Sequence, residues 1–338
     1  MIPFPEVIRK SGDFQAGPPS PLGWIPTRFR TGGFSLVELM VAMAILALLV
    51  VTLASLVGQV SSVWRASNQK IDAFRSAREA FDICRAYLEN ATLDPYYSYD
   101  DAANPTRYLR TSDLAFVIRH GGSAGSLSQN VSAGQEVYFQ SRLGHSANPN
   151  LAGLSGLLNP LAIYVSFETD PSPPAFLQKP ASHRYRLMMA RGATEENKIY
   201  SSAGSDDWFL DLKTNAIPIA DNIILFSVFL RNGDPSDPPV STWDSRANGA
   251  VVPQPADSAQ LPLIADILMV AIDSDTAERL ENGSSPPQPI ADAIDGRFQD
   301  PSQLDSDLVE MERLLTAANV RFQIFRGSIS FKESRWTR

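Results

Sequence analysis

An uninterrupted apolar segment from Phe34 to Val57 is the strongest pattern in the chain, and Glu38 is its only charged residue. At 1.5 Å per residue a helix over this segment would be about 36 Å long, enough to cross a bilayer core of roughly 30 Å with some tilt. An ordinary signal peptide has a shorter apolar stretch, followed by a small-residue cleavage site that this segment lacks. The pattern therefore predicts a transmembrane helix over residues 34–57.

Beyond the predicted span we expect the helix to continue to about Leu93, because the first proline after the span is Pro95. Gly58 is the only glycine of this stretch, and a single glycine need not end a helix. Residues at three- and four-residue steps share one face of a helix, and we expect this face to pack against the rest of the protein. It consists of Val60, Trp64, Ser67, Ile71, Phe74, Ala77, Phe81, Cys84, Leu88 and Ala91.

Residues 94–338 are predicted to form one globular head. Segments that alternate at period two, or that are short apolar runs between turn residues, indicate an antiparallel sheet. These segments are Asp113–His120, Glu136–Arg142, Leu161–Glu168, Arg184–Ala190, Asn222–Arg231, Ile264–Asp273 and Val320–Phe331. Ser306–Ala318 has helical spacing, whereas the proline-rich stretches Asn232–Pro262 and Glu281–Gln303 are predicted to be loops. The pattern favours an α+β fold in which residues 34–93 form a long helix packed on the sheet.

Composition narrows the class of protein. The formal net charge of −8 argues against binding to nucleic acid. Cys84 is the only cysteine, so the chain has no intramolecular disulfide, and the fold must rest on packing. A lone thiol on the apolar side of a helix is more often a small buried hydrophobe than a nucleophile.

The residues just before the predicted span carry a specific signal. Thr31-Gly32-Gly33-Phe34-Ser35-Leu36-Val37-Glu38 resembles the type IV prepilin recognition sequence, in which glycine precedes the cut and phenylalanine becomes the new, usually N-methylated, terminus. The resemblance implies that residues 1–33 are a leader, that a prepilin peptidase cuts between Gly33 and Phe34, and that Phe34 is methylated.

Basic residues predict the orientation of the span. Arg28 and Arg30 lie just before it, and the next charged residue after Glu38 is Arg65. The positive-inside rule therefore places the N-terminus in the cytoplasm. We expect a single-pass protein of the cytoplasmic (inner) membrane with its head in the periplasm.

Glu38 requires an explanation, because a carboxylate in a membrane span is costly to insert, although less so near the interface. The resemblance to prepilins implies that Glu38 faces the amino group of Phe34 on a neighbouring subunit, which neutralises both charges and sets the stagger between subunits. The alternative is an interfacial glutamate that reaches the headgroups or stays protonated.

The chain resembles the minor J-type pseudopilins of type II secretion systems and, more closely, the prepilin-like family called Verru_Chthon cassette protein C. Beyond the prepilin motif the second resemblance is carried by Asp94-Pro95-Tyr96-Tyr97-Ser98-Tyr99-Asp100-Asp101, Asn104-Pro105-Thr106-Arg107-Tyr108, Val137-Tyr138-Phe139-Gln140 and Arg184-Tyr185-Arg186-Leu187-Met188. The prepilin motif and the resemblance to minor pseudopilins imply a non-enzymatic minor subunit that assembles with sibling prepilin-like subunits and presents its head near a filament tip. The alternative is a singly anchored envelope protein whose head binds a ligand or polymer without assembling.

One motif matches a hydrolase. Gly121-Gly122-Ser123-Ala124-Gly125 fits the Gly-x-Ser-x-Gly nucleophile elbow, and His120, His145 and His183 are candidate bases. The elbow needs a strand, a sharp turn and then a helix, but a serine-rich stretch follows here. We interpret the motif as a hairpin loop and expect no catalytic residues.

The sequence also contains acidic and aromatic clusters. Asp100-Asp101, Asp206-Asp207 and Asp273-x-Asp275 lack the spacing of a twelve-residue calcium loop, and three scattered histidines with one cysteine do not make a zinc site. We expect no metal or other cofactor. Four tyrosines, Tyr96, Tyr97, Tyr99 and Tyr108, are candidates for a recognition surface, but we expect them to cover the edge of the core.

Overall fold

The computed structural model describes residues 35–335 except 124, 129–130, 132–133, 152, 155, 170–181, 203–204, 233–235, 247–252 and 256. Contacts divide the chain into two compact units, one up to Ser62 and one from Val63 onward. Helix α1 covers Leu36–Glu89, which confirms the long N-terminal helix. It ends before the predicted Leu93, because β1 (Ala91–Thr92) pairs with the strand β5.

The predicted packing face of α1 is confirmed only in its last four turns. Ala77, Phe81, Cys84 and Leu88 are buried, and Phe74 is partly buried against the same core. Two residues of the predicted face are instead exposed, Val60 by 65% and Trp64 by 68%, while the side chains of Ser67 and Ile71 lie outside the described residues. Helical spacing defines a face along the whole helix, but the packing partner covers only part of its length.

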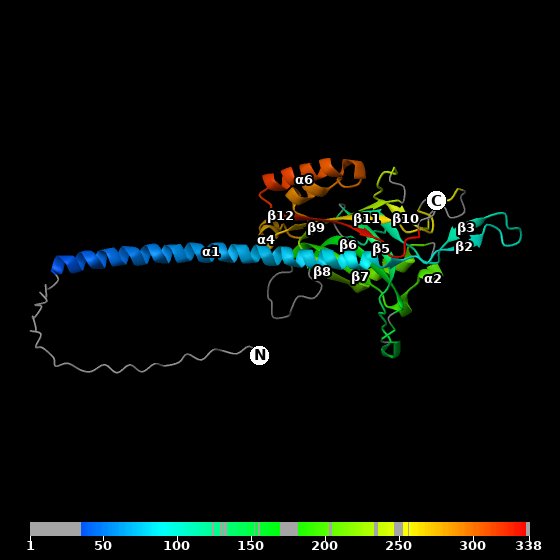
Figure 1. Ribbon diagram of the computed structural model, residues 1–338, viewed down its shortest axis with the longest axis horizontal. Coiled ribbons are helices and arrows are strands. Elements are labelled where there is room, and N and C mark those ends of the chain that lie inside the picture. The colour runs from blue at the N-terminus through cyan, green and yellow to red at the C-terminus, as the bar shows by residue number, and fades with distance from the viewer. Residues whose placement is uncertain are drawn as a thin grey trace, which may run out of the picture. The chain divides into compact units, whose positions relative to one another are not determined.

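The head contains two larger antiparallel sheets and a separate hairpin (Figure 1). The first sheet has the order β10-β4-β5-β6-β7-β8, with β1 added beside β5, and the second has the order β12-β11-β9. Among the described strands, β2 and β3 pair with each other and with no other strand. The bounds are β2 Tyr96–Tyr99, β3 Tyr108–Thr111, β4 Val117–His120, β5 Gln135–Arg142, β6 Leu158–Thr169, β7 His183–Arg191, β8 Ala216–Asp221, β9 Ile223–Arg231, β10 Trp243–Asp244, β11 Ile264–Ile272 and β12 Phe322–Ser330.

Every predicted strand is present with shifted ends, but β1, β2, β3, β8 and β10 were not predicted. The helices after α1 are α2 Ile199–Ser202, α3 Asp207–Leu210, α4 Ser274–Leu280, α5 Gln288–Ile294 and α6 Leu304–Ala317; only α6 was predicted. Helix α5 overturns the predicted loop over Glu281–Gln303. Its Pro289 lies in the first helical turn, where a missing N–H removes no helical hydrogen bond, so this proline does not break the helix.

The core lies between the two sheets of the head. Both faces of β5 are buried: Phe139 contacts Phe116 (centroids 6.4 Å apart), whereas Tyr138 stacks on Phe209 of α3 (4.1 Å). Where the sheets meet, the Gln135 side chain accepts a hydrogen bond from the backbone N–H of Val228 in β9.

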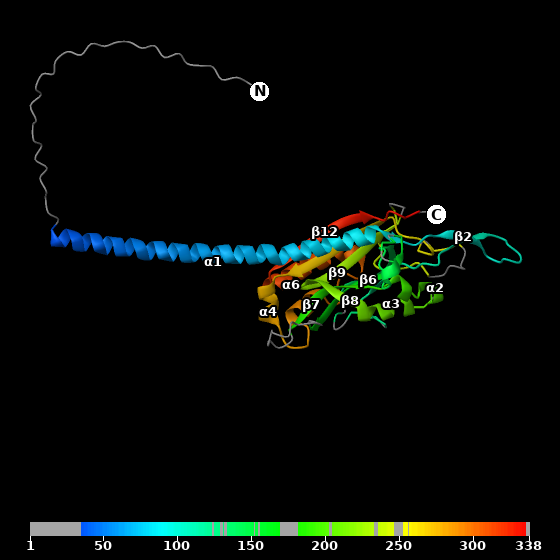
Figure 2. The ribbon, with the colours of Figure 1, turned by 90° about the horizontal axis from the view of Figure 1, so that it is seen from below.

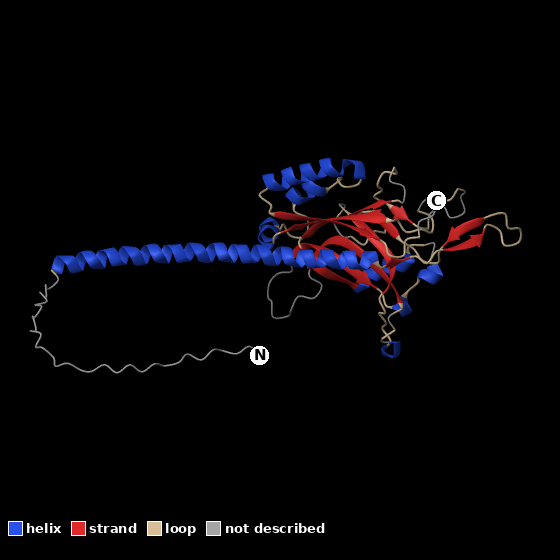
Figure 3. Ribbon diagram, in the orientation of Figure 1, coloured by secondary structure: helices blue, strands red, loops and turns tan. Residues whose placement is uncertain are grey.

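Short helices cover both outer sides of the two sheets. Helices α5 and α6 lie outside the β9-β11-β12 sheet, and α3 lies beside β6 of the first sheet (Figures 2 and 3). The chain is thus an α+β protein with a long N-terminal helix followed by an antiparallel β head, consistent with a pilin-like fold. Burial on both faces of the first sheet explains why its central strands read as continuous apolar runs.

Candidate functional site

The beginning of α1 is stabilised by a reciprocal capping box between Ser35 and Glu38. The Ser35 hydroxyl accepts a hydrogen bond from the backbone N–H of Glu38 (3.2 Å), and the Glu38 carboxylate accepts from the Ser35 N–H (3.0 Å) and hydroxyl (3.1 Å). The Ser35 carbonyl accepts the first helical bond, from the N–H of Leu39 (3.1 Å). Two donors of the helix N-terminus are thereby satisfied.

This geometry gives Glu38 a partner within its own chain. The spacing Ser-x-x-Glu is a sequence signal for a capping box. This box was not predicted from the sequence, because Glu38 was assigned to the Phe34 amine of a neighbouring subunit. Glu38 itself is solvent-exposed in the isolated chain. Gly33 and Phe34, the predicted cleavage junction, lie outside the described residues.

The first part of α1 has the properties of a membrane span. Leu36–Ser61 is long and apolar enough to cross a bilayer, and none of the tested window is buried inside the protein. Within this segment, the Thr52 hydroxyl donates to the carbonyl of Leu49 (2.9 Å), so this polar side chain is satisfied without water.

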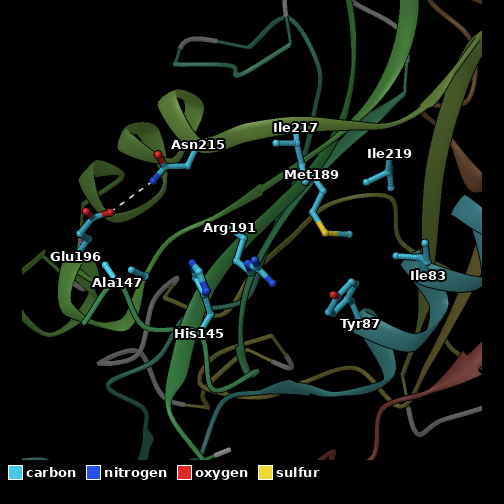
Figure 4. A pocket seen from close by; sticks show the side chains of 11 residues that line it. Ile83, Tyr87, His145, Ala147, Met189, Arg191, Glu196, Asn215, Ile217 and Ile219 are labelled. Atoms are coloured by element: carbon cyan, nitrogen blue, oxygen red, sulfur yellow. Dashed lines mark hydrogen bonds between the residues drawn. The ribbon is translucent and has the colours of Figure 1, made fainter. Parts of the chain in front are cut away.

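A groove of about 530 Å³ lies beside the second part of α1 (Figure 4). It forms because the face of α1 that carries Cys84 and Leu88 enters the core, which leaves the neighbouring flank of the helix turned toward strand β8. Apolar residues from α1, β7 and β8 line one part of the groove, and polar residues line the other. The apolar residues are Ile83, Tyr87, Met189, Ile217 and Ile219. The polar residues are His145, Arg191, Glu196 and Asn215. Sequence reasoning did not identify this groove, since β8 was not predicted.

A second cavity, of about 390 Å³, is bordered by a charged network. The Arg119 guanidinium lies 4.8 Å from the ring centroid of Phe209 and pairs with Asp206 at 3.1 Å. Arg246 pairs with Asp206 (3.0 Å) and with Asp244 (2.8 Å). These paired charges attach α3 to β4 and stabilise the fold locally. The network therefore has a structural role.

The Gly-x-Ser-x-Gly motif lies in the connection between β4 and β5, two paired strands of the first sheet. The Ser123 hydroxyl donates to the carbonyl of His120 (2.7 Å), and the described residues between Ser123 and β5 contain no helix. His145 lies at the groove, and His183 stacks on Phe167 at a centroid distance of 6.0 Å. The His120 ring nitrogen Nε2 lies 3.4 Å from the Ser241 hydroxyl. The described residues after Ser123 therefore lack the strand–turn–helix geometry that a nucleophile elbow requires.

The acidic clusters take part in local structure. Asp273 caps α4 by accepting from the N–H of Thr276 (3.2 Å), and Arg321 pairs with both Asp273 (2.6 Å) and Asp275 (3.1 Å). Among the residues that the structure describes, no group of three or more His, Cys, Asp and Glu could hold a metal ion. Burial raises the pKa of the Cys84 thiol to about 12, which keeps it protonated at neutral pH.

The four tyrosines after α1 do not cover the edge of the core, contrary to expectation. Tyr96, Tyr97, Tyr99 and Tyr108 are exposed by 46%, 61%, 54% and 66%. They lie on the hairpin of β2 and β3, which pairs with no third strand in the part of the chain that the structure describes, so no described sheet buries its side chains.

Comparison with known proteins agrees with the N-terminal assignment. A family model described as the prokaryotic N-terminal methylation motif matches residues 28–54. In searches of curated proteins and of solved structures, no significant match was found. The motif and the apolar helix together indicate a membrane-anchored, prepilin-like protein that a prepilin peptidase processes, and they point to a structural pilin-type role and not to an enzyme.

Proposed function

We propose that this chain is a minor, pseudopilin-like subunit of a type II secretion or type IV pilus-like assembly. A prepilin peptidase would remove residues 1–33 at the cytoplasmic side, and α1 would hold the protein in the inner membrane with its head in the periplasm. The observation that carries the proposal is the methylation motif over residues 28–54, joined to an exposed apolar helix that contains Glu38. Sibling prepilin-like subunits would pack their own apolar helices against this one.

The size of the head supports a minor role. Two sheets, α5, α6 and the loops between them follow α1 in a unit that extends from Val63 to Arg338. A subunit with a head of this size would interrupt the close stacking of repeated small heads, so it would sit at or near a filament tip. The same role, a minor subunit near the filament tip, is predicted from the sequence by the length of the head.

One observation favours a second candidate, a singly anchored envelope protein whose head binds a ligand or polymer without assembling. The Glu38 carboxylate already accepts two hydrogen bonds from Ser35, so capping alone can explain its presence. In that case Glu38 would have no need of the Phe34 amine of another subunit. The two candidates therefore differ in whether the charge of Glu38 matters.

Two substitutions separate charge from capping. Glu38→Gln keeps an acceptor for the Ser35 N–H, because glutamine serves in capping boxes, but removes the negative charge. Ser35→Ala keeps the charge and removes the cap, at a cost to the helix of about 0.5–2 kcal/mol. Assembly through the Phe34 amine predicts that Glu38→Gln loses cross-links to sibling subunits, whereas Ser35→Ala keeps most of them.

The assay is cross-linking in intact membranes, with cleavage and membrane insertion followed on the same samples. Both variants should insert as well as the parent, since removing a charge or a hydroxyl makes the span less costly to bury. If Glu38→Gln cross-links as efficiently as the parent, the intersubunit role of Glu38 is wrong. Absence of any sibling cross-link in the parent itself would favour the anchored envelope protein.

A further inference from the structure

A tyrosine-rich hairpin projects from the head just after α1 ends (Figures 1 and 2). In the register of β2 and β3, Tyr99 lies opposite Tyr108, and Tyr97 lies opposite Arg110. Alternate residues of a strand point to the same face, so the rings of Tyr97, Tyr99 and Tyr108 share one face of the hairpin. The Tyr99 and Tyr108 rings lie 5.1 Å apart between centroids with an interplanar angle of 35°, which makes a continuous aromatic surface.

The base of the hairpin is held by Arg110. The side-chain amide of Gln254 bonds both backbone groups of Arg110, accepting from its N–H (2.7 Å) and donating to its carbonyl (3.0 Å). The Arg110 guanidinium donates to the carbonyl of Pro255 (2.9 Å) and to the side chain of Gln260 (3.2 Å). These bonds fix the strand on which Tyr108 stands.

The tip of the hairpin is held by Asp100. Its carboxylate accepts from the backbone N–H groups of Asp101 (2.9 Å), Thr106 (2.9 Å) and Arg107 (3.2 Å). With base and tip both braced, the tyrosines are presented on a rigid support, and little conformational entropy remains to be lost when a ligand binds. Exposed aromatic rings contribute little to folding, so a braced display of three of them points to recognition.

The make-up of the hairpin narrows the class of ligand. Asp100 pairs with Arg107 at 3.2 Å, so the tip offers no strong net charge that would select an ionic polymer. The aliphatic Leu109 lies on the opposite face from Tyr108. Arg110 shares the face of the three tyrosines, where its guanidinium is bonded to Pro255 and Gln260, so the rings on this face all carry hydroxyl groups and its one cation is held by the head. The whole hairpin spans residues 96–111, fewer than the roughly 20–30 residues that each side of a standard protein–protein interface provides.

Tyrosine rings without aliphatic neighbours suit a ligand that is apolar on its faces and hydroxylated at its edges. A pyranose ring has this chemistry: its C–H face packs on an aromatic ring, and its hydroxyls bond to the phenol groups. We propose that the face formed by Tyr97, Tyr99 and Tyr108 binds a neutral polysaccharide. This binding does not depend on whether the chain assembles into a filament.

The test is retention of the full-length protein on insoluble neutral glycans: microcrystalline cellulose, chitin and granular starch. A polyoxyethylene detergent is used, because a glycoside detergent would compete for the tyrosines. The parent should be retained on at least one glycan and released by the soluble oligosaccharide of the same linkage. The triple variant Tyr97→Thr, Tyr99→Thr and Tyr108→Thr removes the rings but keeps strand preference, and should bind that glycan at least about tenfold more weakly.

Two controls separate recognition from loss of structure. Tyr200→Thr removes a tyrosine of α2 that is as exposed as Tyr108, 66% in both cases, and should leave retention unchanged. Tyr99→Phe with Tyr108→Phe keeps the rings but removes two phenol hydroxyls, and should bind more weakly than the parent but more tightly than the triple threonine variant. The proposal is overturned if none of the three glycans retains the parent, if the triple threonine variant binds as tightly, or if a photo-cross-linker at Tyr99 captures a protein partner in its place.

Discussion

Replacing Phe81 measures how far the head depends on α1. The Phe81 side chain is 5% exposed, and its ring centroid lies 6.0 Å from that of Phe325 in β12. A Cβ atom added at Gly327 would lie 3.3 Å from two atoms of the Phe81 ring, so the helix and the strand are in close contact. Phe81→Ala should therefore cost about 3–5 kcal/mol in the free energy of unfolding, because surrounding backbone limits collapse into the cavity.

The assay is urea unfolding of a fragment that begins at Arg65, close to the start of the compact unit at Val63. We expect this fragment to fold, since the span lies outside it. Ile83→Ala is the control on the same helix: Ile83 is 40% exposed, two residues further along α1, and should cost clearly less than Phe81→Ala. Phe81→Asp should destabilise more than Phe81→Ala by burying an unpaired charge, and Phe74→Asp less, because Phe74 is only partly buried.

A second substitution tests the contact itself. Gly327→Ala should destabilise the parent but cost less in the Phe81→Ala background, where the cavity accommodates the added methyl group. If Phe81→Ala and Ile83→Ala unfold at the same urea concentration as the parent, α1 is not part of the core. Equal costs of Gly327→Ala in both backgrounds would show that the strand does not contact the Phe81 ring.

Mass spectrometry of the membrane form should find an N-terminus at Phe34, with methylation; an intact Met1 or cleavage beyond the apolar segment would contradict the prepilin assignment. Asp273→Ala removes the cap of α4 and an ion pair, and should lower stability by about 1–2 kcal/mol in urea unfolding, while Asp275→Ala, at an exposed partner of the same arginine, should have a much smaller effect. Cys84 should resist alkylation at pH 8 in the folded protein and react fully in denaturant, since burial raises the pKa of its thiol. Rapid alkylation of folded protein would show that α1 separates from the sheets.

The features that the sequence alone determined are local ones. The apolar segment after Phe34 requires a helix because an unpaired backbone cannot lie in lipid, and this holds whatever the head does. The seven predicted strands are alternating or short apolar runs, a pattern that can be recognised without knowledge of their partners. The residues that cap α1 are likewise local, since Ser35 and Glu38 meet three positions apart on one helical turn.

Only the tertiary structure decided which surfaces are covered. The helical spacing that puts Phe81 on the packing face of α1 puts Trp64 on the same face. Phe81 is nevertheless buried and Trp64 exposed, because the sheets cover only part of that face. Ile217 of β8 lines the groove beside α1 only because β8 pairs with β7 at the edge of the sheet. Tyr99 and Tyr108 are exposed because none of the described strands pairs with their hairpin, and strand pairing is not encoded by any local pattern.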